Sequence, residues 1–294
     1  MGLQRWIDHH IHVSQFSRDG KPREQLADEL LDVIDRSGAD LRLVLSPDLP
    51  EVNRMRTDPT WVLEASRTIH QLTQAAPDRL FGACTINPHH LRESLEAVEI
   101  CFGEWGFVLF GEMLQYIMDY DPAGTESVAL VRRCAELGVP VQLHVSTNTE
   151  KGVEHFAGLM RMAQAVPDAK VILAHALGGA MSDYYIDQVQ ACGIPLDRLW
   201  LEIRDFNHPD ILTRAMAELG ADRLIVGTDW TTRIGPPFQP YGVLFSTDTS
   251  ENPYPPSVAS LVGFLREAGA SEPEIEQIAW RNANELLGLG LANG

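Results

Sequence analysis

Short apolar runs alternate with longer amphipathic segments along this chain, and the alternation limits the folds that it can adopt. Eight runs have the length and residue types of buried strands: 5–12, 40–46, 80–86, 107–112, 139–145, 170–175, 199–204 and 223–229. Apolar residues recur at helical spacing over 22–37, 60–76, 90–104, 123–137, 152–165, 180–192, 208–219, 256–268 and 273–287. Strict strand–helix alternation with eight strands predicts an α/β fold of the (β/α)8, or TIM barrel, type.

The residues after the first run separate this barrel from an open, doubly wound sheet. An open sheet that binds nucleotides has a glycine-rich phosphate loop at that point. This chain instead continues with Val13-Ser14-Gln15-Phe16. Because α/β barrels commonly reach this length as one domain, we expect residues 1–294 to form a single TIM-barrel domain.

Residues that can bind metal ions stand in or at the ends of four of these runs. His10 and His12 lie two positions apart in the first run, and residues at that spacing share one face of a strand. On a regular strand, the neighbouring His9 would face the helices. His144, His175 and Asp229 end three further runs. A single histidine of this kind is usually a hydrogen-bonded core residue, but four strands with the same feature predict a metal or catalytic site where the strand ends of a barrel meet.

The charge of the chain excludes several classes of partner. The formal net charge is −18, and the sequence has no cluster of Lys or Arg. Binding to nucleic acids or anionic membranes depends on basic side chains, so neither partner is expected. No apolar run is long enough to cross a bilayer, and the N-terminus lacks the pattern of a signal peptide. The expected partner is a small-molecule substrate and the expected location is the cytoplasm. Barrels of this size often form homo-oligomers through their outer helices, but no sequence feature decides this.

The motifs resemble those of the amidohydrolase superfamily. The resemblance is strongest to the branch that contains aminocarboxymuconate semialdehyde decarboxylase, γ-resorcylate decarboxylase and pyrone dicarboxylate hydrolase. It runs nearly from end to end and rests on Asp8-x-His10-x-His12, Pro140-Val141-Gln142-Leu143-His144, Ala174-His175-Ala176-x-Gly178-Gly179, the segment 221–229 and the tail 278–289. It implies a barrel enzyme that depends on a divalent metal.

The resemblance also implies roles for individual residues. In the family, the first-strand histidine pair, the fifth-strand histidine and the eighth-strand aspartate bind the ion, and these positions are His10, His12, His144 and Asp229. His175 matches a histidine that binds a second ion in binuclear members and is catalytic in mononuclear ones. Imidazoles with a carboxylate suit zinc, with manganese or iron as alternatives. One ion or two per chain remain open.

Glu112 departs from the commonest family pattern. It ends the fourth run, where many binuclear amidohydrolases have a carbamylated lysine and some subgroups, such as the TatD-type deoxyribonucleases, have a glutamate after glycine. Val108 and Phe110 share its strand parity, so Glu112 is expected to point into the barrel. A buried, unpaired carboxylate is costly, which favours a partner cation. Glu112 could bridge two ions, bind one ion, or hydrogen-bond to substrate or to a neighbouring histidine.

Three functions follow from these residues. The first is hydrolysis of an ester, lactone or amide, with water activated on the metal, Asp229 transferring the proton and His175 polarising the carbonyl. The second is decarboxylation of a small unsaturated or aromatic acid, in which Asp229 or His175 protonates carbon. The third is a non-catalytic barrel that binds metal or ligand. Glu112 favours hydrolysis, because a carboxylate at this position resembles hydrolytic subgroups.

Two arginines near the predicted mouth indicate a substrate that carries a carboxylate. Arg204 ends the seventh run and Arg233 follows Asp229, and a guanidinium can grip a carboxylate with two hydrogen bonds. For Arg204, the competing interpretation is an ion pair with Asp205 or Glu202. Trp230 and Tyr116 are candidates for apolar walls of the substrate site. The irregular stretch 231–256 is expected to cover the substrate.

Overall fold

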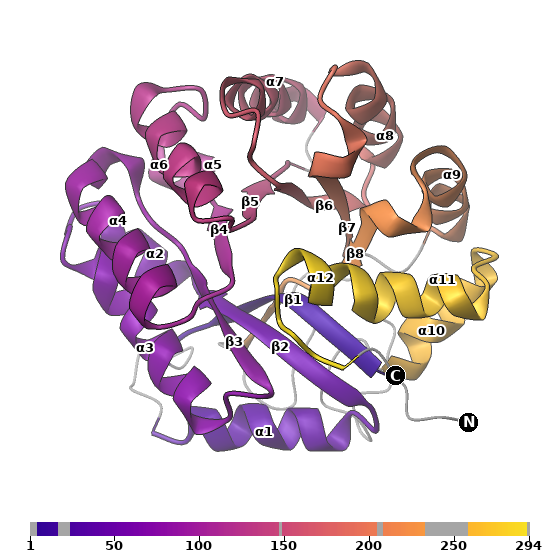
Figure 1. Ribbon diagram of the computed structural model, residues 1–294, viewed down its shortest axis with the longest axis horizontal. Coiled ribbons are helices and arrows are strands. Elements are labelled where there is room, and N and C mark those ends of the chain that lie inside the picture. Colours follow the sequence, from indigo (N-terminus) through magenta and orange to yellow (C-terminus); the bar gives the residue numbers. More distant parts are fainter. Residues whose placement is uncertain (1–4, 17–23, 147–148, 205–207, 233–257, 293–294) are drawn as a thin grey trace.

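The strands of the protein follow one another in chain order around a central axis, and the helices surround them (Figure 1). The computed structural model describes residues 5–16, 24–146, 149–204, 208–232 and 258–292. Within them, one sheet of nine parallel strands has the order β8-β7-β6-β5-β4-β3-β2-β1-β9. The strands are β1 (Arg5–Val13), β2 (Asp40–Pro47), β3 (Leu80–Cys84), β4 (Leu109–Met113), β5 (Val141–His144), β6 (Val171–Leu177), β7 (Leu199–Ile203), β8 (Leu224–Val226) and β9 (Trp230–Thr231). This is the predicted (β/α)8 barrel.

The long helices follow the strands as the apolar spacing predicts. The helices are α1 (Leu26–Arg36), α2 (Leu49–Met55), α3 (Trp61–Ala75), α4 (Leu91–Val98), α5 (Gln115–Met118), α6 (Thr125–Glu136), α7 (Thr149–Ala165), α8 (Ser182–Ala191), α9 (Pro209–Leu219), α10 (Val258–Glu267), α11 (Glu272–Glu276) and α12 (Asn282–Leu286). Short 3₁₀ or π segments are η1 (Pro88–His90), η2 (Glu99–Glu104), η3 (Leu196–Arg198), η4 (Ala221–Arg223) and η6 (Gln277–Arg281). The helices α2 and α5 were not predicted, because so few residues give no clear period. No helix among the described residues has both the length and the apolar character needed to span a membrane.

The sheet closes between its first and last strands. β8 pairs with β7, whereas β9 pairs with β1. Between β8 and β9, the backbone N–H of Asp229 donates to the carbonyl oxygen of His10 at 2.9 Å. The carboxylate of Asp8 accepts hydrogen bonds from the backbone N–H and the hydroxyl of Thr228 at 3.0 and 2.5 Å. The predicted run 223–229 is therefore an interrupted strand, and the interruption places Asp229 beside β1.

The position of His9 differs from the prediction. The pairing register between β1 and β2 shifts between Asp8 and Ile11, so β1 is not regular there. Nδ1 of His9 lies 2.5 Å from the carbonyl oxygen of Val226, and Nε2 lies 3.0 Å from Oε2 of Glu202. His9 therefore lies against β7 and β8 rather than facing the helices, because the irregularity breaks the alternation on which the prediction relied.

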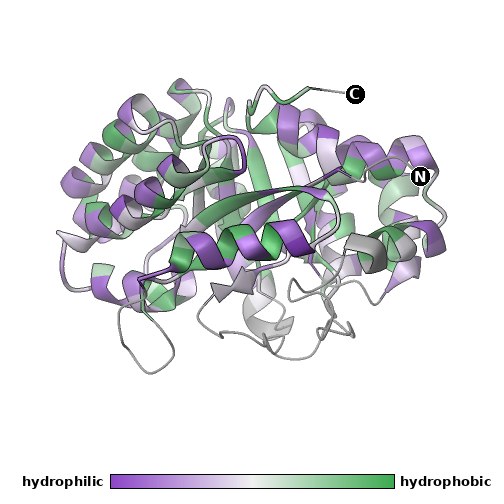
Figure 2. Cartoon of the chain, turned by 90° about the horizontal axis from the view of Figure 1, so that it is seen from below, coloured by the Kyte–Doolittle hydropathy of each residue, from purple (hydrophilic) through white to green (hydrophobic). Residues whose placement is uncertain are grey.

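Two apolar layers hold the barrel together. One lies between the strands and the helices, and Figure 2 shows strands that are mostly hydrophobic beneath helices that carry both kinds of residue. The other fills the interior of the barrel and includes Ile7, Val44, Ala83, Leu109, Ile172, Trp200, Ile225, Trp280, Ala283, Leu286 and Leu287. The last four of these come from η6, α12 and the residue that follows α12, and both elements pack against β1 and β8. The amino-terminal part of the barrel is therefore closed by apolar side chains.

Candidate metal centre

The six predicted metal-site side chains meet at the carboxyl ends of the strands. They are His10 and His12 of β1, Glu112 of β4, His144 of β5, His175 of β6 and Asp229, which follows β8. All of them except His10 line a cavity of about 220 Å³, and His10 is fully buried directly behind it. The structure therefore places all six predicted residues close together at one end of the barrel.

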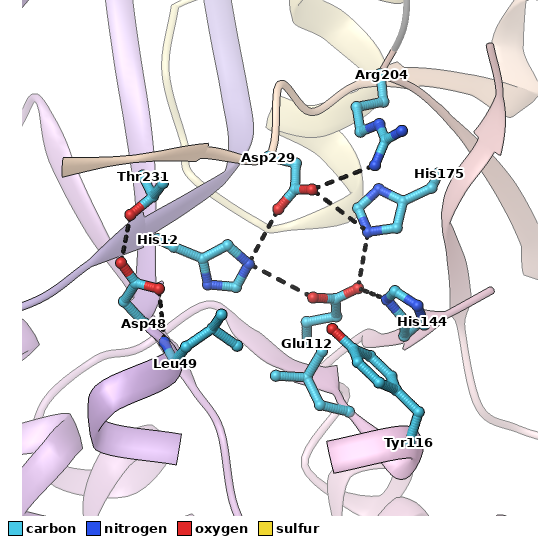
Figure 3. Close-up of a pocket in the computed structure, with 11 residues that line it drawn as sticks. His12, Asp48, Leu49, Glu112, Tyr116, His144, His175, Arg204, Asp229 and Thr231 are labelled. Carbon is cyan, nitrogen blue, oxygen red and sulfur yellow. Dashed lines mark hydrogen bonds and ion pairs between the residues drawn. The ribbon is translucent and has the colours of Figure 1, made fainter. Parts of the chain in front are cut away.

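Glu112 lies between two pairs of imidazoles. Its Oε2 is 3.5 Å from Nε2 of His10 and 3.5 Å from Nε2 of His12. Its Oε1 is 2.7 Å from Nδ1 of His144 and 3.0 Å from Nε2 of His175. Figure 3 shows the carboxylate between His12 on one side and His144 with His175 on the other. Because each oxygen faces a different pair, the carboxylate has the placement of a group that can bridge two cations.

Asp229 faces the same space from the opposite side. Its Oδ1 lies 3.2 Å from Nε2 of His12, and its Oδ2 lies 3.8 Å from Nε2 of His175 and 3.4 Å from Nη1 of Arg204. The side chain is 28% exposed, so molecules in the cavity can reach it. Asp229 and His175 have backbone φ angles of 55° and 62°. Such left-handed conformations are uncommon outside glycine and cluster at functional sites.

Hydrogen bonds behind the first histidine pair fix which ring nitrogens face the centre. Nδ1 of His10 lies 2.9 Å from Oε2 of Glu202, and Nδ1 of His12 lies 3.0 Å from the carbonyl oxygen of Pro47. Carboxylate and carbonyl oxygens only accept, so each Nδ1 carries a hydrogen and each neutral ring has its lone pair on Nε2. The two Nε2 atoms are 3.1 Å apart. Two lone pairs that face each other at this distance fit a cation that both nitrogens bind.

The carboxylates make this part of the barrel favourable for positive charge. Burial acts to lower the pKa of His12, but hydrogen bonds to Asp229 and Glu112 outweigh it and raise this pKa to about 10. Burial also acts to lower the pKa of His175, but the negative charges of Asp229 and Glu112 outweigh it and raise this pKa to about 9. Burial acts to raise the pKa of Glu112, but the charges of His144 and other imidazoles hold it well below its usual value. Protons and a metal ion therefore compete for the same nitrogens.

The donor atoms suit a divalent ion. Three groups of residues could each hold an ion, because the ligand atoms within each group all lie within 4.8 Å of one another. The groups are His10, His12 and Glu112; His10, His175 and Asp229; and Glu112, His144 and His175. Imidazole nitrogens combined with carboxylate oxygens are the usual ligands of zinc, and they also accept manganese and iron. The residues present fit the metal that the family resemblance implied.

The predicted substrate residues lie in different surroundings. Arg204 lines the cavity and reaches Asp229, a contact that the sequence reading did not foresee. Tyr116 is 51% exposed, lines the cavity, and has its ring centroid 4.5 Å from that of His144. Trp230 is buried, and it is not among the described residues that line the cavity. Arg233 lies outside the described residues, as does almost all of the predicted covering stretch 231–256.

Sequence reasoning missed the role of Glu202. This residue of β7 is fully buried, and it accepts hydrogen bonds from Nδ1 of His10, Nε2 of Gln142 and the backbone N–H of His175 at 2.9, 3.0 and 3.0 Å. The available signal was a carboxylate inside an otherwise apolar strand, Leu199–Ile203, because a buried charge requires partners. That carboxylate was considered only as a partner of Arg204.

Comparisons with known proteins agree with this fold. The family model described as Amidohydrolase matches residues 7–289. A search of curated proteins gives no match.

Solved structures with the same fold catalyse different reactions. A dihydroxybenzoic acid decarboxylase from Polaromonas sp. JS666, with bound manganese and the inhibitor 2-nitroresorcinol, has a TM-score of 0.67 at 18% identity, over 99% of this chain and 98% of that one. A 4-oxalomesaconate hydratase from Rhodopseudomonas palustris has a TM-score of 0.67 at 16% identity, over 97% and 96%. A protein from Acinetobacter baumannii, described as a probable 2-pyrone-4,6-dicarboxylic acid hydrolase with citric acid bound, has a TM-score of 0.64 at 16% identity, over 97% and 100%. At these identities the likeness shows the fold and not the reaction. The family match covers most of the chain, which therefore belongs to the amidohydrolase family.

Proposed function

We propose that this protein is a metal-dependent hydrolase whose centre holds two divalent ions on either side of Glu112. Its substrate would be a small molecule that carries a carboxylate and an ester, lactone or amide bond. The single observation that carries the proposal is the placement of Glu112, whose two oxygens face different pairs of histidines. Two-ion sites of this kind are common in enzymes that attack a substrate with water.

Each proposed ion has its own set of ligands. His10, His12, Asp229 Oδ1 and Glu112 Oε2 would hold the first, and the converging Nε2 atoms of the two histidines support this position. His144, His175 and Glu112 Oε1 would hold the second, and the mutual proximity of these three groups supports it. Zinc is the expected ion, with manganese and iron as alternatives.

Asp229 is the proposed group that moves the proton. A divalent ion held here would lower the pKa of a water molecule to about 7 and polarise a substrate oxygen. Burial acts to raise the pKa of Asp229, but the charges of His175 and of other imidazoles hold it well below its usual value. Its carboxylate is therefore the form that can accept a proton at neutral pH. Because the side chain is partly exposed to the cavity, Asp229 can pass that proton to the leaving group.

Arg204 and Tyr116 are the proposed substrate contacts. Arg204 lines the cavity beside Asp229, where its guanidinium can pair with a substrate carboxylate through two hydrogen bonds. Tyr116 and Leu114 offer apolar surface at the same cavity. A cavity of about 220 Å³ suits a small molecule.

The test is the metal content per chain of protein purified without chelator and without metal-affinity resin. The variants are Glu112→Gln and, as a control, Glu51→Gln. Glu51 is also a buried glutamate, but its Oε1 accepts from the hydroxyl of Ser14 and the backbone N–H of Gln15 and not from an imidazole. We expect about two ions in the wild type and the control, and about one in Glu112→Gln.

Activity assays on the same preparations complete the test. Turnover of esters, lactones or amides by the loaded wild type supports hydrolysis. A wild type that holds one ion per chain, with the same content in Glu112→Gln, would overturn the two-ion centre. If the loaded chain instead releases CO₂ from unsaturated or aromatic acids and hydrolyses none of the first panel, the reaction assigned here is wrong. A chain that takes up neither zinc nor manganese would contradict the metal mechanism as a whole.

A further inference from the structure

A second carboxylate lies directly behind the histidines that surround Glu112. Glu202 is fully buried, and five nitrogen atoms from β1, β5 and β6 surround its two oxygens. Its Oε2 accepts from Nδ1 of His10 and Nε2 of Gln142, and it lies 3.0 Å from Nε2 of His9. Its Oε1 accepts from the backbone N–H of His175 and lies 3.1 Å from Nδ1 of the same residue. Three of these contacts are hydrogen bonds, and the other two bring ring nitrogens of His9 and His175 close to the same oxygens.

The two oxygens of Glu202 serve the two proposed ion positions separately. His10 has Glu202 Oε2 at its Nδ1 and Glu112 Oε2 at its Nε2, at 2.9 and 3.5 Å. His175 has Glu202 Oε1 at its Nδ1 and Glu112 Oε1 at its Nε2, at 3.1 and 3.0 Å. The two rings stack with centroids 5.2 Å apart and an angle of 21° between their planes. Each imidazole is therefore held between the same two carboxylates.

The backbone just after β8 leaves Glu202 little room to move. A Cβ atom built on Gly227 would lie 2.5 Å from Glu202 Oε2 and 2.7 Å from Cβ of His10. The glycine at this position therefore provides the space that the carboxylate occupies. A fully buried charge is tolerated only where hydrogen bonds replace its water, and the surrounding nitrogens supply them.

We propose that Glu202 is a positioning residue that fixes the ring orientation and the Nδ1–H tautomer of both His10 and His175, and so sets the affinity of both ion positions. This inference rests on the proposed function of the centre. Carboxylates that accept from the far nitrogen of a metal-binding histidine orient the ring and make the near nitrogen a better ligand. Glu202 does this for one histidine in each of the two ligand sets.

The structure predicts which ion position suffers in Glu202→Gln. The new amide replaces one acceptor oxygen by an NH₂ donor. The backbone N–H of His175 can only donate, so the remaining oxygen is expected to stay on that side. The NH₂ group then faces Nδ1 of His10, which must give up its hydrogen and carry it on Nε2 instead. A hydrogen on Nε2 blocks the atom that would bind the first ion. The side-chain amide of Gln142 can rotate to present its oxygen to the new NH₂ group. The ring of His10 cannot accept at Nδ1 without moving its hydrogen to Nε2.

The experiment is titration of the metal-stripped full chain with Co²⁺, followed by visible absorption, which reports the ligands of the ion directly. The proteins are the wild type, Glu202→Gln, Gln142→Met and the control Glu51→Gln. For Glu202→Gln we expect the Co²⁺ equivalent bound at His10 and His12 to lose about 10–100-fold in affinity, with a changed absorption band. Gln142→Met removes one donor to Glu202 without touching an imidazole, and a smaller loss in the same direction is expected. The control should match the wild type in both readouts.

Thermal melting of each metal-stripped variant shows whether it is folded. A folded Glu202→Gln protein with two wild-type Co²⁺ affinities and a wild-type spectrum would overturn the role of Glu202 and leave the two-ion centre intact. If Glu202→Gln does not fold, Gln142→Met decides, and an unchanged affinity and spectrum in that variant would count against the proposal. A wild type that binds no Co²⁺ would overturn the metal centre itself and this inference with it.

Discussion

The two ends of the barrel are built from the same strands but hold opposite kinds of side chain. Toward the amino ends of the strands, the interior contains apolar residues such as Ile7, Ile172 and Trp200, closed off by Trp280. A few positions further along the same strands, the interior contains histidines and carboxylates. Apolar packing stabilises the first end by itself, whereas the second brings buried charges together and depends on bound protons or a bound cation to offset the cost of burying them. The comparison separates the residues that hold the fold from those that carry the chemistry.

The largest expected effect is at the polar end, in Asp229→Asn. An amide cannot accept the proton that the proposed hydrolysis moves, so we expect kcat to fall by about 10²–10⁴-fold. Because the carboxylate of Asp229 pairs with His12 and His175, its replacement should also lower the melting temperature of the metal-free chain, so kcat is compared at a temperature where both proteins are folded. Asp222→Asn is the matched control, since Asp222 is 58% exposed and pairs with Arg223. Equal kcat values for Asp229→Asn and the wild type would remove Asp229 from the mechanism.

The complementary change at the apolar end is Trp280→Ala. Trp280 is 2% exposed and packs inside the barrel, so its removal should lower the free energy of unfolding by about 3–5 kcal/mol. Urea unfolding measures this loss, and Trp280→Phe should lose less. The metal content of the folded fraction should equal that of the wild type. If Trp280→Ala instead lost metal at wild-type stability, the two ends would not be separate in function.

A smaller effect, on pH dependence, should again come only from the polar end. The folded, metal-free chain holds protons on His12 and His175 with pKa values of about 10 and about 9, whereas an unfolded histidine has a value of about 6.5. The stability from these two groups is therefore complete below about pH 6.5 and is lost as the pH rises through about 9 and 10. Urea unfolding of the metal-stripped chain at a series of pH values measures it.

Metal binding should reverse this pH dependence. Zinc displaces protons from the same nitrogens, so its apparent affinity should rise with pH up to the pKa values of His12 and His175. Calorimetric titration at neutral pH, in buffers with different ionisation enthalpies, counts the protons released. An affinity that does not change with pH, with no proton release, would mean that zinc binds elsewhere than at these imidazoles.

The sequence allowed most of the fold and the candidate ligands to be predicted, because both depend on patterns along single strands. His144 ends an apolar run and His10 and His12 share a face, so their meeting follows from the barrel. Glu112 does point into the interior, but strand parity is not the reason: Leu109 packs inside the barrel, Phe110 belongs to the outer layer, and the register of β4 against β5 shifts between Phe110 and Met113. The meeting of the histidines needs only the period of a strand and the knowledge that the strand ends converge.

The features that the sequence did not predict depend on contacts between distant strands. His9 was misplaced because the irregularity in β1 cannot be recognised in its sequence. Glu202 was missed because its partners come from β1, β5 and β6, and a single carboxylate in an apolar run does not show which of them it reaches. The contact between Arg204 and Asp229 likewise joins residues that follow different strands. Such side chains acquire their roles from neighbours that only the folded chain supplies.

The most direct measurement of the central claim is a crystal structure of the zinc-loaded protein with an anomalous difference map. We expect two peaks, about 3.5–4 Å apart, with the carboxylate of Glu112 between them. One peak should lie beside His10 and His12, and the other beside His144 and His175. A single peak, with Glu112 hydrogen-bonded to an imidazole and not bound to metal, would contradict the two-ion centre.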